Sequence, residues 1–290
     1  MVHRWGSVAP WIEPFPRSIP PCSLRSVTAR LVVVGGGKMG EALVAGVIKG
    51  GFASITDLAV VEAYEPRRAE LAATFPGLAI AETVPSDADG AVLAVKPADV
   101  AAAAAALGEA QPQRVVSIAA GVTLATLEAL LPGIPVVRAM PNTAAVVGAG
   151  ASAIAPGTTA GPGDLDWAER VLGAVGLVVR VAEKSLDAVT GLSGSGPAYV
   201  FLVAEALIEA GVLMGLDRVT SSALARQTLL GAGRLLDDSG ESPADLRAAV
   251  TSPAGTTAAG LRVLEQRAVR AAFIDAVAAA TERSRELGRS

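Results

Sequence analysis

The sequence predicts an α/β protein in two parts, an N-terminal doubly wound parallel sheet of Rossmann type followed by an all-helical domain. Two observations carry this prediction. Short apolar strands alternate with helical stretches from Ala29 onward, which favours parallel strands joined by right-handed crossovers. Beyond Glu183, apolar residues recur only at helical spacing. We therefore expect a doubly wound sheet domain over residues 29–182 and an all-helical domain over 183–290.

A glycine turn follows the first expected strand, residues 31–34, and leads into a helix over 39–50. Its glycines match the pattern G-x-G-x-x-G at a strand-to-helix elbow, where the first permits the tight turn, the second lets the backbone approach a pyrophosphate, and the third lets helix pack on strand. The unpaired N–H groups at the helix start favour phosphate. We expect the dinucleotide to bind Gly35, Gly36, Gly37, Lys38, Met39 and Gly40.

The remaining elements follow from hydrophobic periodicity. Strands are expected at 58–62, 90–95, 114–119, 136–140, 151–155 and 177–181, with helices at 66–74, 98–107, 123–131 and 164–175. Helical spacing then covers 185–212, 218–237, 242–250 and 256–287. Ligands of such sheets bind at the carboxyl ends of the strands. The sequence places Gly35–Gly40, Glu62, Lys96-Pro97, Ala119–Gly121 and Pro141–Thr143 at those ends.

The acid that closes the second strand bears on the choice of cofactor. Glu62 is placed to accept hydrogen bonds from a ribose 2′-hydroxyl and would repel a 2′-phosphate. Arg67 and Arg68 follow shortly after and could neutralise that phosphate. The residues therefore leave both NADPH and NADH open as cofactors.

Composition excludes several other functions. The formal net charge of the 290 residues is −4 and no long basic run occurs, so we expect no nucleic-acid partner. We also expect no membrane partner, because no uninterrupted apolar stretch is long enough to span a bilayer. Cys22 is the single cysteine and His3 the single histidine, so neither an internal disulfide nor a metal site is expected. A cytoplasmic location follows as the simplest expectation.

The N-terminal segment, residues 1–28, is rich in proline and lacks sustained periodicity. We expect either a disordered extension or a start assigned too far upstream, with Val27 as a plausible first residue. The helical half, in contrast, has apolar faces on many helices. Such a domain is expected to form a homodimer or a larger homo-oligomer rather than a monomer.

Two stretches of the helical half carry more than periodicity. Residues 187–199 read Asp-Ala-Val-Thr-Gly-Leu-Ser-Gly-Ser-Gly-Pro-Ala-Tyr, and residues 250–257 read Val-Thr-Ser-Pro-Ala-Gly-Thr-Thr. Together with Ala94–Pro97, Ser117–Gly121 and Arg138–Thr143, they closely resemble pyrroline-5-carboxylate reductase, over nearly everything from about residue 30 to 290. The resemblance implies reduction of 1-pyrroline-5-carboxylate to L-proline with NADPH or NADH, the last step of proline biosynthesis, by dimers or oligomers built from dimers.

The resemblance also assigns residues. It implies that Thr257 meets the substrate ring nitrogen, that Ser252 and the backbone of Gly255, Thr256 and Thr257 hold the substrate carboxylate, and that Glu183 is an acid near the substrate. Ala254 replaces the first of a usual glycine pair and would restrict this turn if its φ is positive. The cofactor, near its nicotinamide end, would be lined by Ala94, Val95, Lys96, Pro97, Ser117, Ala119 and Asn142.

The chemistry agrees with the resemblance. A protonated imine already carries positive charge and gives a neutral amine, so its reduction needs orientation and a hydrogen-bond partner such as Thr257 more than a strong acid.

Other interpretations of these residues stay open. On the residues alone, 194–197 also fits a plain helix start, 252–257 a plain loop and helix cap, and Tyr199 a packing residue. A β-hydroxyacid dehydrogenase would share the glycine loop and a helical second domain. That family relies on a lysine in the helical domain, whereas the last lysine of this chain, Lys184, precedes those helices. A non-catalytic nucleotide sensor would bind NAD(P)H without turning over an imine.

Overall fold

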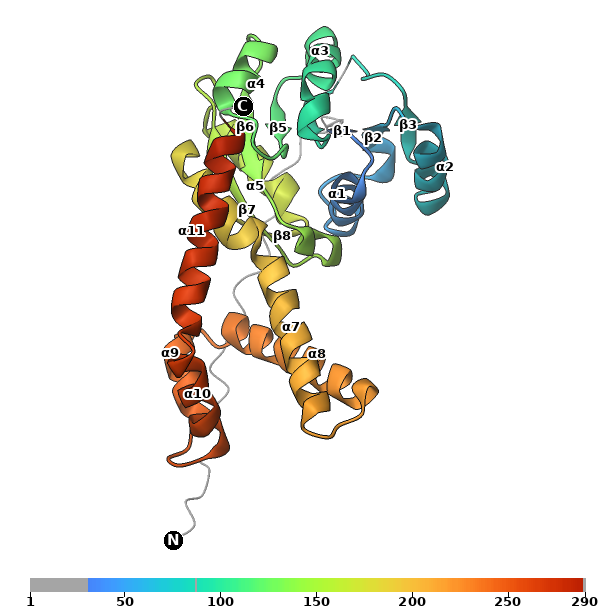
Figure 1. Ribbon diagram of the computed structural model, residues 1–290. Helices are drawn as coiled ribbons and strands as arrows, with labels where there is room; N and C mark the ends of the chain where they lie inside the picture. Colours follow the sequence, from blue (N-terminus) through green and yellow to red (C-terminus); the bar gives the residue numbers. More distant parts are fainter. Residues whose placement is uncertain (1–30, 87, 289–290) are drawn as a thin grey trace.

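The computed structural model describes residues 31–86 and 88–288, so the expected extension over 1–28 lies outside the described residues. Its centre is one eight-stranded sheet in the order β3-β2-β1-β4-β5-β6-β7-β8 (Figure 1). All neighbours pair in parallel except β6 and β7, which are antiparallel. The strands are β1 (Leu31–Val34), β2 (Leu58–Val61), β3 (Ala79–Ala81), β4 (Gly90–Leu93), β5 (Val115–Ser117), β6 (Val136–Met140), β7 (Gly150–Pro156) and β8 (Gly176–Arg180).

Helices cover both faces of this sheet, so its central strands are buried on both sides. In β1, Leu31 and Val33 belong to one hydrophobic core, whereas Val32 and Val34 belong to the other. Residues of α1 (Lys38–Lys49), α2 (Glu65–Thr74) and α5 (Pro162–Gly173) pack in the first core. Residues of α3 (Val100–Ala110) and α4 (Leu124–Leu130) pack in the second. The doubly wound arrangement expected from the sequence is confirmed.

The helical half extends away from the sheet (Figure 1). It begins with α6 (Leu186–Val189) and a turn of π-helix at Thr190–Gly194, and α7 leads outward from there. The last helix, α11, runs back so that its carboxyl end packs beside the π-helix. The remaining bounds are α7 (Gly196–Leu213), α8 (Arg218–Asp238), α9 (Pro243–Ala249), α10 (Thr256–Gln266) and α11 (Val269–Leu287).

The structure corrects four details of the sequence-based prediction. The short strand β3 was not expected, and the periodic stretch 185–212 is interrupted by the π-helix. The stretch 256–287 forms two helices, because Ala268 adopts a left-handed φ of 54° between them. The sheet is also not wholly parallel. The connection between β6 and β7, residues 141–149, is too short for a crossover helix, so β7 turns back antiparallel.

One stretch of the described chain, Glu183–Leu213, is apolar and long enough to cross a membrane by length and composition alone. The expectation that no segment would meet this criterion is therefore wrong, because the helices there run on with few charges. A single such helix is a weak sign of a membrane. None of the most apolar part of this stretch is buried within the single chain. An apolar helix that packs against a second copy of the protein would be exposed in the single chain in the same way.

Candidate active site

The glycine elbow after β1 has the geometry that a dinucleotide requires. Gly35 has φ +107°, and a Cβ there would lie 2.5 Å from the Ala94 carbonyl oxygen. A Cβ at Gly40 would lie 2.1 Å from the Gly35 oxygen, so helix and turn could not stay this close with any other residue. Gly37 precedes α1 with open space where its Cβ would be and with no side-chain cap. The first N–H groups of α1 are thus left for an anion.

A cleft of about 580 Å³ opens beside this elbow. It lies between β1 and β4, where the order of the strands reverses, which is the binding position in doubly wound sheets. Its floor is formed by the strand ends and one wall by α3. The lining residues are Val34, Gly35, Gly37, Val61, Glu62, Ala63, Glu82, Val84, Ala94, Val95, Lys96, Asp99, Ala102, Ala103 and Ala106.

Glu62 is held in place at one corner of the cleft. Its carboxylate accepts hydrogen bonds from the backbone N–H groups of Gly36 and Tyr64, each at 2.9 Å. Arg67 supports the same loop, since its Nε donates to the Gly36 oxygen at 2.7 Å. Hydrogen bonds to Glu70 and then to Glu41 raise the pKa of Arg67 above its ordinary value. Arg67 therefore stays charged, and its hydrogen bonds hold this corner of the cleft in place.

Of the residues expected at the nicotinamide end, some line the cleft and others hydrogen-bond to the backbone around the strand ends. Lys96 is exposed at the mouth of the cleft. Ser117 is fully buried, and its Oγ accepts a long hydrogen bond, 3.4 Å, from the N–H of Ala119. The Asn142 Nδ2 donates to the Ser193 oxygen at 3.0 Å, and its Oδ1 accepts from the Ala151 N–H at 3.1 Å. Ser117 and Asn142 thus brace the backbone around the strand ends.

The segment 187–199 is a joint between the sheet domain and α11. A Cβ at Gly191 would lie 2.4 Å from the Thr281 Oγ1 of α11, so the two backbones touch closely. The Ser284 hydroxyl of α11 donates to Asp187 at 2.7 Å. The Tyr199 hydroxyl donates to the Gly191 oxygen at 3.1 Å, which is a packing role.

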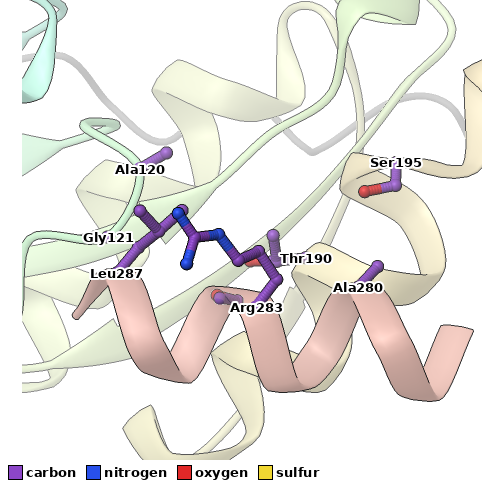
Figure 2. A pocket seen from close by; sticks show the side chains of 8 residues that line it. Ala120, Gly121, Thr190, Ser195, Ala280, Arg283 and Leu287 are labelled. Atoms are coloured by element: carbon purple, nitrogen blue, oxygen red, sulfur yellow. The ribbon is translucent and has the colours of Figure 1, made fainter. Parts of the chain in front are cut away.

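A small cavity of about 220 Å³ remains at this joint, between the π-helix, α11 and the loop after β5. Figure 2 shows Arg283 extending from α11 along the cavity and Ser195 from the start of α7. The lining also includes Ala120 and Gly121, directly beyond the expected cofactor residue Ala119. The two sequence motifs around 119 and 195 therefore meet in space.

Glu183 links the two halves of the chain. Its Oε1 accepts hydrogen bonds from the Leu124 N–H at the start of α4, 2.6 Å, and from the Arg138 Nη1, 2.8 Å. The sequence analysis included Arg138 in the 138–143 motif but gave it no role of its own. A charged residue in the middle of an otherwise apolar strand was the available signal.

The Ser-Pro-Ala-Gly turn at 252–255 leads into α10. The N–H of Gly255 donates to the Ser252 oxygen at 3.0 Å, and a Cβ at Gly255 would lie 2.3 Å from the Ser252 Oγ. Ala254 has a left-handed φ of 58°, the conformation in which an alanine is strained. Most of the turn is exposed, and α10 lies at the opposite end of the molecule from the cleft (Figure 1). The single chain does not bring Thr257 and the cleft together.

The cradle of glycines, the cleft at the reversal of strand order and the appended helical half define a dinucleotide-dependent oxidoreductase of the Rossmann class. Two family profiles agree. One, described as NADP oxidoreductase coenzyme F420-dependent, matches residues 30–121, and one, described as pyrroline-5-carboxylate reductase dimerisation, matches residues 183–287.

Similar proteins make the family specific. Pyrroline-5-carboxylate reductase of Methanosarcina acetivorans is 45% identical over 88% of this chain and 97% of its own. That of Mycobacterium tuberculosis is 44% identical over 89% and 97%. The solved reductase of Coxiella burnetii has a TM-score of 0.86 at 35% identity, covering 91% of this chain and 100% of its own. That of Plasmodium falciparum, with NADP bound, has a TM-score of 0.78 at 28% identity over 90% and 98%. The chain belongs to the pyrroline-5-carboxylate reductase family.

Proposed function

We propose that this protein transfers a hydride from NAD(P)H to the C=N bond of 1-pyrroline-5-carboxylate and releases L-proline, the last step of proline biosynthesis. The observation that carries the proposal is the pairing of two features in one chain. A glycine-cradled cleft fits a dinucleotide, and the Ser-Pro-Ala-Gly-Thr-Thr turn opens α10 within the matched dimerisation region.

The residues present fit a dinucleotide. Side chains at Gly35 or Gly40 would collide with backbone, so these positions are kept free for the turn and helix to meet. The open approach at Gly37 and the uncapped start of α1 suit a pyrophosphate. When bound, NAD(P)H supplies the hydride. Gly35–Gly40, Glu62, and the strand-end residues Ala94–Pro97 would hold it, with Ser117, Ala119 and Asn142 fixing the backbone around the nicotinamide end.

The protein's task in the reaction is to orient the imine. In the protonated imine, the hydride adds to the ring carbon, the C=N π electrons move to nitrogen, and a neutral secondary amine results. No side chain has to supply a proton in that step. We assign to Thr257 the hydrogen bond to the ring nitrogen, through its hydroxyl, which holds the ring face against the hydride donor.

The carboxylate of the substrate needs an anion site. The first N–H groups of α10, at Thr256 and Thr257, have no partners within the helix, and the helix dipole favours a negative charge there. Gly255 lets the backbone turn closely around Ser252. We assign the Ser252 hydroxyl and the N–H groups of Gly255–Thr257 to the carboxylate, and Glu183 to positioning, through its contacts to α4 and Arg138.

The site is completed between two copies of the chain. Thr257 lies in the first turn of α10, a helix at the far end of the molecule from the cleft (Figure 1). The exposed apolar residues of α7 and α8 offer a face for a second copy. In such a dimer the α10 turn of one protomer reaches the cleft of its partner. Residues 29–182 would then bind the dinucleotide, and residues 183–290 would dimerise and hold the substrate. We place the enzyme in the cytoplasm, without nucleic-acid or membrane partners.

The test is oxidation of NADH and NADPH, followed by absorbance, with 1-pyrroline-5-carboxylate as substrate. We expect imine-dependent oxidation, and binding of dinucleotide without any turnover would contradict the proposal. Thr257→Ala should lower kcat/KM about 10- to 100-fold, the loss of one aimed hydrogen bond, without changing dinucleotide affinity. Thr257→Ser keeps the hydroxyl and should retain most of the activity. Equal losses in both variants would remove the hydroxyl from the mechanism.

A further inference from the structure

The corner of the cleft that follows β2 and β3 contains both acids and arginines. Glu62 and Glu82 line the cleft there, and Arg67 and Arg68 lie on the adjoining first turn of α2. In a doubly wound sheet this corner faces the ribose that carries either a 2′-hydroxyl or a 2′-phosphate. Which of these groups can bind depends on whether an arginine is available to it.

Arg68 is engaged within the chain through both of its Nη atoms. Its Nη1 donates to the carbonyl oxygens of Glu62 and Ala63, at 3.0 and 2.7 Å, and its Nη2 forms an ion pair with the Glu82 carboxylate at 2.5 Å. Only 19% of the Arg68 side chain is exposed, against 70% of Glu82. The cleft therefore meets the carboxylate of this pair before the guanidinium.

Arg67 is engaged as well, on the other side of the same turn. Its Nη2 pairs with Glu41 at 2.5 Å, its Nη1 with Glu70 at 2.8 Å, and its Nε donates to the Gly36 oxygen. Lys38 is the nearby cation that stays largely exposed, but its Nζ lies 3.9 Å from Glu41, at the start of α1 rather than beside Glu62. Each arginine that could hold a 2′-phosphate already has a carboxylate partner.

The acids at the corner act in the opposite direction. Glu62 is fixed by two backbone N–H groups, so it cannot swing away from an incoming ligand. A neutral 2′-hydroxyl can donate to such a carboxylate, whereas a dianionic 2′-phosphate would meet the carboxylates of Glu62 and Glu82 while both neighbouring arginines are already paired.

We propose that this chain prefers NADH, and that Glu82 is a specificity-determining residue that acts through Arg68 by keeping its guanidinium away from the 2′ position. The inference rests on the proposed use of NAD(P)H at this cleft. Two acids would then set the preference. Glu62 contacts the ribose directly, and Glu82 keeps the Arg68 guanidinium from binding a 2′-phosphate.

The test is the dissociation constant of each dinucleotide, from quenching of protein fluorescence or from calorimetry, without imine. The unmodified protein should bind NADH at least about tenfold more tightly than NADPH. Glu82→Ala should tighten NADPH binding about tenfold and leave NADH within about twofold, because Arg68 gains a free edge. In Glu82→Ala/Arg68→Ala the gain should vanish. Glu70→Ala is the matched control: Arg67 stays paired with Glu41 and bonded to the Gly36 oxygen, so the ratio should not change.

Three results would overturn the inference: tighter binding of NADPH by the unmodified protein, equal changes for both dinucleotides in Glu82→Ala, or a gain that persists without Arg68. Because the titrations contain no imine, these results leave the proposed reaction untouched. Conversely, a protein that shows the expected ratio but reduces no pyrroline-5-carboxylate would contradict the proposed function alone.

Discussion

The two halves of the chain are packed in opposite ways. In the sheet domain, strands and helices bury two continuous hydrophobic cores, one on each face. Among the described residues from 183 onward, the buried hydrophobic ones are Leu186 and Ala225 alone, whereas large apolar residues such as Phe201, Leu213 and Ile274 are exposed. Exposed apolar surface of this extent is unfavourable in water. The first half is complete as a single chain, and the second is completed by another copy.

The strongest way to break this contrast is to place a charge on the apolar face of α7. Phe201 is 63% exposed in the single chain, and Phe201→Glu would bury a carboxylate in the dimer. We expect the dimer to weaken by about 100-fold or more and turnover to be lost with it, while dinucleotide affinity stays unchanged. Light scattering and dinucleotide titration measure the two separately. Phe201→Leu is the control, and an active, dimeric Phe201→Glu would refute the account.

A second variant disables the sheet domain without touching the helical half. A Cβ at Gly37 would meet no atom within 4 Å, so Gly37→Asp should retain the fold. Its carboxylate would occupy the start of α1, where the pyrophosphate belongs, and we expect dinucleotide affinity to fall about 100-fold while the dimer persists. Gly163→Asp adds the same charge in the first turn of α5, also in open space, and should leave affinity unchanged. Similar losses in both variants would point to a general charge effect.

The smallest expected effect concerns the strained turn in the helical half. Ala254→Gly relieves a left-handed φ of 58° and should raise the free energy of unfolding by about 1 kcal/mol. Ala268→Gly, at φ 54° between α10 and α11, should give a similar gain. Thermal unfolding compares the two. Only Ala254→Gly should also change the KM for the imine. If Ala268→Gly changes this KM as well, the effect does not come from the 252–255 turn.

Much of the sheet domain could be predicted because its signals are local. The β-branched run at 31–34 and the glycines after it specify strand, turn and helix within ten or so residues. The strand β3 was missed, because Ala-Ile-Ala is three residues long and only partly buried. Missing it also hid Glu82, which follows that strand.

Features that depend on contacts between distant residues were beyond the sequence. The partnership of Glu183 with Arg138 joins residues 45 apart, and that of Asp187 with Ser284 joins residues 97 apart. The sequence indicated that Ala254 would restrict the turn if its φ were positive, and its φ of 58° meets that condition. The residue roles at Ser252, Thr257 and the nicotinamide end stay predictions, because Thr257 and the cleft do not meet within one chain.

The most direct test of the central claim mixes two proteins that are each strongly impaired. Gly37→Asp lacks a working cleft and Thr257→Ala lacks the aimed hydroxyl. If the site forms between protomers, each mixed dimer holds one intact site, because the cleft of the Thr257→Ala chain faces the Thr257 of the Gly37→Asp chain. Co-refolding equal amounts should then restore about one quarter of the unmodified turnover, since half of the dimers are mixed and half of their sites are intact. Turnover that stays at the level of the separate variants would place the whole site within one chain and contradict the account.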